Sequence, residues 1–150
     1  GAGAAGGFER AGSATGAVLD AGGPQGGNGS FKASTDATGA LAGRTHGRVG
    51  ERPGRRALVS GLVDEGKAVA AEQGIVLDAD PEALIDHAAQ PEVAYDHKAS
   101  MLQDVEARRT TEIDFLNGGI VRFGSEHGVP TPLNDAIWAL VKGVEESWRP

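Results

Sequence analysis

A chain of 150 residues is long enough for one domain with a buried core, and with aromatics at 5% that core must consist mainly of Ala, Val, Leu and Ile. The net charge of −7 argues against nucleic acid or anionic lipid as a partner, and the absence of cysteine excludes disulfides and thiolate chemistry. No apolar run is as long as a membrane span and no signal-peptide segment is recognisable, so we expect a soluble cytoplasmic protein.

Residues 1–30 hold nearly half of all the glycines and almost no large apolar side chains. Such a composition predicts an irregular segment, because little surface can be buried to offset the entropy lost on ordering. Within it, Gly1, Gly3 and Gly6 match the GxGxxG pattern of dinucleotide-binding turns. That function requires a strand before the motif and a helix after it, and Gly12 interrupts the helix. The residues alone favour a chance match.

The ordered part is predicted to begin at Phe31 and to continue through residues 32–45. A helix is predicted over residues 55–73, with Gly74 as its stop. Its apolar residues recur on one face at helical spacing: Leu58, Leu62, Val63, Val69 and Ala70. The sequence Asp80-Pro81-Glu82 then provides an N-cap, a first-turn proline and a first-turn acid for a short helix through Ala89.

Two further helices are predicted on either side of Thr110-Thr111, whose hydroxyls are suited to cap the second of them. The first has apolar residues at positions 101, 102 and 105; the second, with apolar positions 113, 116, 120 and 123, ends near His127-Gly128. On one unbroken helix Ser100 and Glu112 would lie about 18 Å apart. A turn at the threonines would instead let both side chains converge on one cleft.

The last predicted helix follows Thr131-Pro132, and its apolar residues recur at helical spacing: Leu133, Ile137, Leu140, Val141, Val144 and Trp148. Glu145-Glu146 is interpreted as part of a solvated face. The four histidines show no metal-ligand spacing, so no metal site is predicted. Since no segment alternates apolar and polar residues for long, the predicted fold class is an all-α helical bundle.

Four segments in fixed order resemble one known family, the ketopantoate reductases (2-dehydropantoate 2-reductases). They are Ser100–Asp104, Thr111–Asp114, Leu116–Gly118 and Gly128–Asn134. The resemblance is clear over the last third of the chain and weaker from about Phe31 onward. It implies that residues 31–150 correspond to the helical C-terminal domain of that family, and that residues 1–30 are a remnant of its NADPH-binding Rossmann domain. In that interpretation Gly1, Gly3 and Gly6 are a weak cofactor-binding candidate.

The resemblance also implies roles for four side chains. Lys32 aligns with the catalytic acid of the family, Glu112 with a carboxylate that orients the lysine or the substrate hydroxyl, and Ser100 with a hydrogen-bond donor to the substrate. Asp36 stands where the family places a substrate-binding asparagine. The alternatives stay open at this point: Lys32 as a solvated lysine, Ser100 as a helix N-cap, and Glu112 as a first-turn acid.

The implied reaction is the NADPH-dependent reduction of 2-dehydropantoate to pantoate, in pantothenate and coenzyme A biosynthesis. The resemblance implies NADPH and a small 2-keto acid as ligands, and neither nucleic acid nor a membrane as partner. It leaves open whether the chain forms a homodimer. The alternative hypothesis is a non-catalytic helical module for dimerisation or partner binding that has lost its cofactor domain.

Overall fold

The computed structural model describes residues 29–77 and 79–150, and within these ranges the chain forms seven helices and no strand. The helices are α2 (Gly29–Ala42), α3 (His46–Val49), α4 (Pro53–Glu72), α5 (Pro81–Ala88), α6 (Ser100–Glu106), α7 (Asn117–His127) and α8 (Pro132–Glu146). The predicted all-α fold is therefore confirmed for this part of the chain. The predictions for residues 1–28, including the glycine motif, lie outside the described residues.

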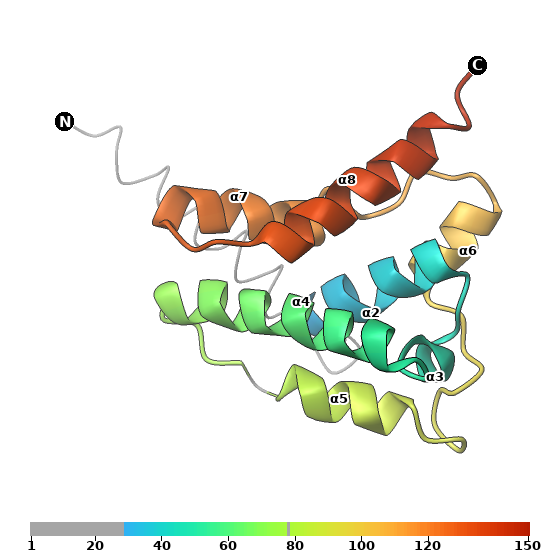
Figure 1. The fold of residues 1–150 in the computed structure, drawn as a ribbon, viewed down its shortest axis with the longest axis horizontal. Coiled ribbons are helices and arrows are strands. Elements are labelled where there is room, and N and C mark those ends of the chain that lie inside the picture. Colours follow the sequence, from blue (N-terminus) through green and yellow to red (C-terminus); the bar gives the residue numbers. More distant parts are fainter. Residues whose placement is uncertain (1–28, 78) are drawn as a thin grey trace.

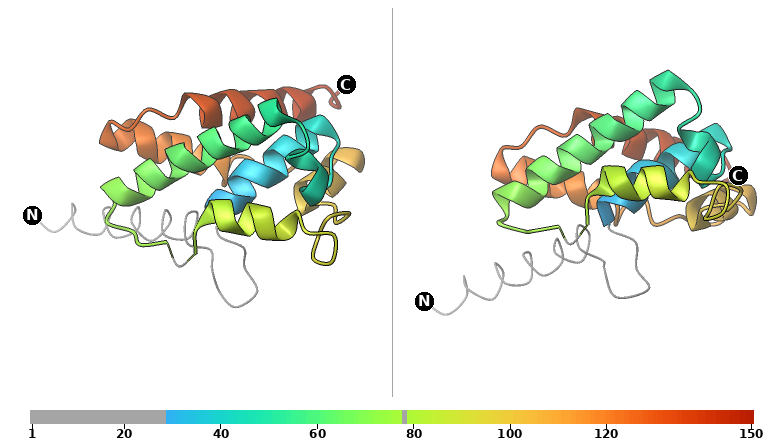
Figure 2. Two further views of the ribbon diagram at one scale, coloured as in Figure 1. Left: turned by 60° about the horizontal axis from the view of Figure 1, so that its bottom comes forward. Right: turned by 90° about the horizontal axis from the view of Figure 1, so that it is seen from below.

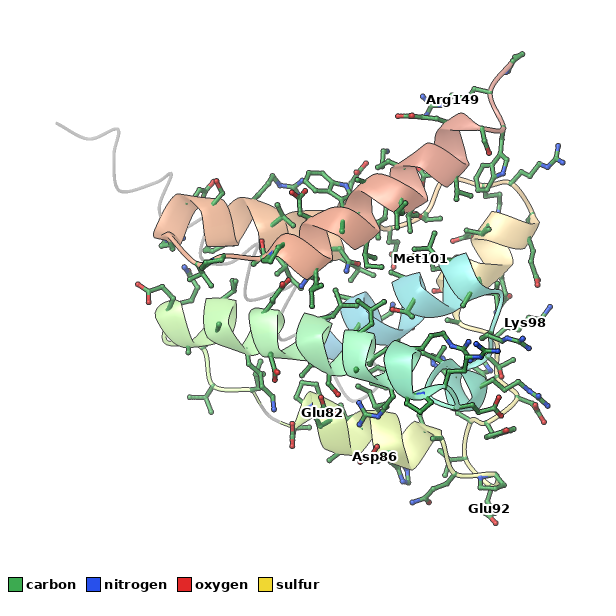
Figure 3. All side chains as sticks on the ribbon, viewed as in Figure 1. Glu82, Asp86, Glu92, Lys98, Met101 and Arg149 are labelled. Atoms are coloured by element: carbon green, nitrogen blue, oxygen red, sulfur yellow. The ribbon has the colours of Figure 1, made fainter. Side chains whose placement is uncertain are left out.

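Helix α2 lies at the centre of the fold, where it packs against α3, α4, α5, α6 and α8. Helices α7 and α8 lie together on one side of α2 and α4, and α5 lies on the opposite side (Figures 1 and 2). Arg56 of α4 joins α5 to this arrangement through Glu82 and Asp86, at 2.6 and 3.0 Å, and Figure 3 labels both acids on α5.

The burial of α2 explains why its sequence shows no clear amphipathic pattern. Every residue from Ala33 to Ala40 is buried, and all of them are small or medium-sized, so neighbouring helices can approach closely from several sides. The hydroxyls of Thr35 and Thr38 donate to carbonyl oxygens four residues earlier, each at 2.7 Å. These bonds satisfy buried hydroxyls inside the helix itself.

The core is built around α2 from the apolar faces of the surrounding helices. Its largest fully buried apolar side chains are Leu62, Met101, Ile113, Ile120, Val69 and Val141. A second, smaller cluster consists of Val49, Val59, Val63 and Ile85. Met101, labelled in Figure 3, packs into the core around α2 from the short helix α6, and its neighbour Leu102 is 3% exposed. Of the face predicted for α4, Leu62, Val63, Val69 and Ala70 are buried, whereas Leu58 is half-buried.

Several predicted helix ends are confirmed by their backbone geometry. Gly74 and Gly128 follow α4 and α7 with φ of +67° and +71°, the left-handed conformation that glycine adopts without a Cβ clash. At α5 the Asp80 carboxylate accepts a hydrogen bond from the backbone N–H of Glu82 at 3.2 Å, with Pro81 in the first turn.

The break at Thr110-Thr111 is confirmed, but the helix that follows begins later than predicted. Helix α6 ends at Glu106 and α7 begins at Asn117. The Thr111 hydroxyl accepts from the Ile113 N–H at 3.2 Å, and the Ile113 side chain is fully buried. Residues 112–116 therefore form a turn in which the Leu116 N–H donates to the carbonyl of Glu112, before the regular helix starts.

Helix α8 buries only some of the apolar residues that recur along it at helical spacing. Leu133 and Leu140 are 36% and 58% exposed, so they lie outside the buried face. The interpretation of Glu145 as solvated was wrong, because its exposed fraction is 3%. The buried stripe is Asn134, Ile137, Val141 and Glu145, with a polar residue at each end that finds hydrogen-bond partners in the fold.

Candidate functional site

The candidate site is centred on an ion pair between two of the residues selected from the sequence. Lys32 lies in the first turn of α2, and Glu112 lies in the turn between α6 and α7. The Lys32 Nζ is 3.6 Å from Glu112 Oε2. The fold therefore brings together the predicted lysine and the predicted carboxylate, although 80 positions of sequence separate them.

The exposure of this pair argues against a mainly structural role. The side chains of Lys32 and Glu112 are 33% and 61% exposed. Ion pairs so open to water typically contribute about 0–1 kcal/mol to folding, since water and salt screen them. The Lys32 ammonium can therefore reach a ligand in solution, and Glu112 supplies an acceptor that limits where the ammonium points.

Asp36 lies one helical turn after Lys32 on α2 and is 3% exposed. Burial raises the pKa of its carboxyl from 3.8 to about 6, and the negative charge of Glu112 adds to this rise. The positive charge of Lys32 and a hydrogen bond from the Thr35 hydroxyl at 3.3 Å act in the opposite direction. The site thus combines one ammonium with two carboxyl groups, one of which changes its charge near pH 6.

Ser100 is exposed at the first position of α6, and the N-cap position belongs to Ala99. The N-cap alternative for Ser100 is therefore wrong, since a cap must precede the first helical residue. Among residues 29–77 and 79–150, no hydrogen bond or ion pair joins Ser100 to Lys32, Asp36 or Glu112. Its role as a substrate donor stays a prediction.

The structure adds a polar network beside Glu112 that sequence reasoning missed. The Glu145 carboxylate accepts hydrogen bonds from the Thr111 N–H at 2.8 Å and from the Thr111 hydroxyl at 2.7 Å. Lys142 bridges Glu145 and Asp114, at 3.1 and 3.0 Å, and the Trp138 indole N–H donates to Asp114 at 2.7 Å. One sequence signal was available, because position 145 continues the helical stripe of the apolar positions 137 and 141.

A second missed network orients α7 and α8 around α2. Asn117 is fully buried at the start of α7 and donates to the carbonyl of Ala33 at 2.9 Å and to the side chain of Asn134 at 3.0 Å. Glu65 of α4 accepts from the backbone N–H groups of Leu133 and Asn134 at the start of α8. A carboxylate at a helix N-terminus satisfies its free donors and is favoured by the helix dipole.

The described residues provide neither a dinucleotide-binding turn nor a metal site. A dinucleotide pyrophosphate is usually held by a glycine turn between a strand and a helix. Residues 29–77 and 79–150 form no strand and therefore contain no such turn, so this part of the chain does not fit NADPH by itself. The candidate residues Gly1, Gly3 and Gly6 lie outside this part of the chain. Within it, no cluster of three or more His, Asp or Glu side chains is placed to hold a metal ion. None of its helices is long and apolar enough to span a membrane.

Comparisons with curated proteins find similar chains named 2-dehydropantoate 2-reductase. The one from Vibrio cholerae is 39% identical over 92 residues, which cover 61% of this chain and 30% of the relative. The one from Archaeoglobus fulgidus is 35% identical over 100 residues, which cover 67% of this chain and 33% of the relative. The chain thus spans about a third of the length of these curated relatives.

Solved structures are also similar to a large part of this chain. A PanE/ApbA family ketopantoate reductase from Ralstonia eutropha superimposes with a TM-score of 0.73 at 31% identity, over 79% of this chain and 39% of that one. A D-mandelate dehydrogenase, solved with NADH and anilino(oxo)acetate, gives a TM-score of 0.74 at 31% identity, over the same shares of the two chains. The family model described as "Ketopantoate reductase PanE/ApbA C terminal" matches residues 29–145. This chain therefore belongs to the ketopantoate reductase PanE/ApbA C-terminal domain family.

Proposed function

We propose that this chain forms the helical, substrate-binding part of a ketopantoate-reductase-like oxidoreductase that reduces 2-dehydropantoate to pantoate. The observation that carries the proposal is the solvent-accessible ion pair between Lys32 and Glu112, at 3.6 Å, beside the buried carboxyl of Asp36. The family and the relatives' names support the same class of reaction, although each relative is about three times as long as the matched region.

The proposed role of Lys32 follows from the charge that develops when a keto group is reduced. The carbonyl oxygen becomes an alkoxide, which a nearby ammonium stabilises and then protonates. Lys32 carries three N–H donors, so it can contact Glu112 and still donate to a substrate oxygen. Glu112 is the proposed orienting carboxylate, which holds the ammonium in position through the contact at 3.6 Å.

Ser100 and Asp36 are the proposed substrate-binding side chains. A serine hydroxyl at the start of α6 can donate a hydrogen bond to a substrate carboxylate or hydroxyl. Below about pH 6 the Asp36 carboxyl is neutral and can donate a hydrogen bond, whereas its ionised form would repel an anionic keto acid.

The first test is the affinity for 2-dehydropantoate, measured by isothermal titration calorimetry. We expect Lys32→Ala and Glu112→Gln each to weaken binding about tenfold or more, because a hydrogen bond to a charged group is worth about 1.5–3 kcal/mol. Lys67→Ala is the matched control, since Lys67 also forms an exposed ion pair, with Asp80 at 2.9 Å. Equal affinities for Lys32→Ala and the parent chain would exclude the proposed role of Lys32.

The second test concerns turnover. NADPH would supply the hydride in the complete reaction, and the described residues do not fit this cofactor by themselves, so we expect no steady oxidation of NADPH by this chain with excess keto acid. Hydride transfer requires reacting atoms about 3–3.5 Å apart, and a helical domain alone does not hold the nicotinamide there. The absorbance of NADPH reports the outcome, and steady turnover that is lost in Lys32→Ala would contradict the expected inactivity.

The alternative function, a helical module for dimerisation, has one observation in its favour. Leu133 and Leu140 are exposed on α8, and Phe115 is 47% exposed in the turn before α7. Single exposed apolar residues are common on monomers, so this observation carries less weight than the ion pair. A chain that binds no keto acid and sediments as a dimer that Leu140→Lys dissociates would favour this alternative.

A further inference from the structure

The position of Glu112 requires an explanation, because its own side chain does not hold it in place. It lies in a turn outside any helix, and its side chain is 61% exposed, so packing does not immobilise it. Its two neighbours differ from it completely, because Thr111 is 8% exposed and Ile113 is fully buried. The Glu112 carbonyl accepts from the N–H groups of Phe115 and Leu116 within the turn, and the residues on either side of Glu112 attach this turn to the rest of the fold.

On the N-terminal side, Glu145 of α8 fixes Thr111. One oxygen of the Glu145 carboxylate accepts from both the N–H and the hydroxyl of Thr111, at 2.8 and 2.7 Å. The Thr111 hydroxyl in turn accepts from the Ile113 N–H, so the bonds extend across Glu112. Burial would raise the pKa of Glu145, but the donors on Thr111 and Lys142 outweigh it and lower the pKa below its ordinary value. The buried carboxylate stays ionised and keeps its acceptor strength.

On the C-terminal side, Asp114 is fixed by the same helix. Its carboxylate accepts from the Trp138 indole N–H at 2.7 Å and contacts the Lys142 ammonium at 3.0 Å. Lys142 also donates to the second oxygen of Glu145 at 3.1 Å. The contacts to Thr111 and the contacts to Asp114 therefore belong to one network. Successive turns of α8 thus hold Thr111, immediately before Glu112, and Asp114, two positions after it.

From this geometry we infer that Glu145 and Lys142 are positioning residues, which hold Glu112 where it can pair with Lys32. Their contacts reach Thr111 and Asp114, and none of the described contacts of Glu145 or Lys142 involves Glu112 or Lys32 themselves. Their effect on a ligand is therefore indirect and must pass through Glu112. The consequence for keto-acid binding rests on the proposed function, whereas the order of the turn does not.

The first experiment measures the order of the turn without any ligand. We expect Glu145→Gln and Lys142→Met to lower the NMR order parameter of the Glu112 amide from about 0.85 to below about 0.6, as in a flexible loop. Glu146→Gln is the matched control, because Glu146 is the exposed neighbour of Glu145 on the same helix. An unchanged order parameter in Lys142→Met overturns the inference, whatever the chain binds; this variant also serves if Glu145→Gln does not fold.

The second experiment asks whether the effect passes through Glu112. We expect Glu145→Gln to weaken 2-dehydropantoate binding about tenfold in the parent chain and less than about twofold when Glu112→Gln is already present, since residues that act as a unit are not additive. Lys142→Arg should restore most of the affinity lost in Lys142→Met, because it retains the positive charge. If Glu145→Gln weakens binding equally in the parent chain and in the Glu112→Gln variant, Glu145 has a general structural role, and the inference is overturned.

The two experiments also separate this inference from the proposed function. If the parent chain binds no keto acid, or Lys32→Ala does not change its binding, the proposed function fails. The order parameter of Glu112 still decides the positioning role in that case. If binding depends on Lys32 and Glu112 but not on Glu145 or Lys142, the proposed function stands and the positioning role is wrong.

Discussion

Replacing Leu116 with Ala should lower the free energy of unfolding by roughly 2–5 kcal/mol, the usual cost of truncating a buried leucine. Leu116 is 3% exposed and packs in the core that surrounds α2, at the junction of the turn and α7. Ile120→Ala should have a similar effect, because Ile120 is 1% exposed in the same core. Urea denaturation followed by circular dichroism measures both values.

Leu140→Ala is the matched control for this experiment. It removes the same atoms from a leucine that is 58% exposed on α8, so the change should stay within about 0.5 kcal/mol of the parent chain. A cost of Leu116→Ala no larger than that of Leu140→Ala would contradict the core described here.

Asp36→Asn should raise the free energy of unfolding by about 3 kcal/mol at about pH 8, and by less than about 1 kcal/mol at about pH 4. Burial raises the folded pKa of Asp36 from 3.8 to about 6. Below pH 3.8, the pKa of this carboxyl in the unfolded chain, the group is neutral in both the folded and the unfolded state. Folding then buries no charge at this position. Between pH 3.8 and about 6 the unfolded state loses its proton first, so the parent chain becomes less stable as the pH rises.

Asparagine keeps the size and the polarity of Asp36 but has no charge to bury. The stability of the variant should therefore not fall as the pH rises through this range. Asp64→Asn, at an exposed position on α4, is the control for removing one negative charge from the chain. Urea unfolding of the three proteins across this pH range measures the difference. An Asp36→Asn effect that does not grow between about pH 4 and pH 7 would contradict a raised pKa at this position.

The parts of the fold that the sequence predicted correctly are those governed by local rules. Gly74 and Gly128 end helices because a residue without a Cβ adopts positive φ at no steric cost. Asp80 begins α5 because its carboxylate reaches an N–H two residues later. Each of these signals lies within a few residues of the structure it determines, so no knowledge of the fold was needed.

The errors occurred where distant partners override local preference. Glu145 is next to another glutamate and suggests a solvated surface, yet it is buried because Thr111, 34 positions away, supplies two donors. The same contact delays the start of α7, since Thr111 is held by α8 instead of capping a helix. Helix α2 was not recognised from periodicity, because it is buried on several sides and has no polar face to create a pattern.

The fold class, several helix ends, the break at Thr110-Thr111 and the resemblance that the family match bears out could all be predicted from the amino-acid sequence. Three features became visible only in the folded chain: Lys32 and Glu112 meet at 3.6 Å, Asp36 is buried beside them, and α8 holds the turn around Glu112. Helix caps and glycine conformations can be predicted because they depend on neighbouring residues. Burial, ion pairing and pKa depend on which distant elements pack together, and a single sequence does not specify that directly.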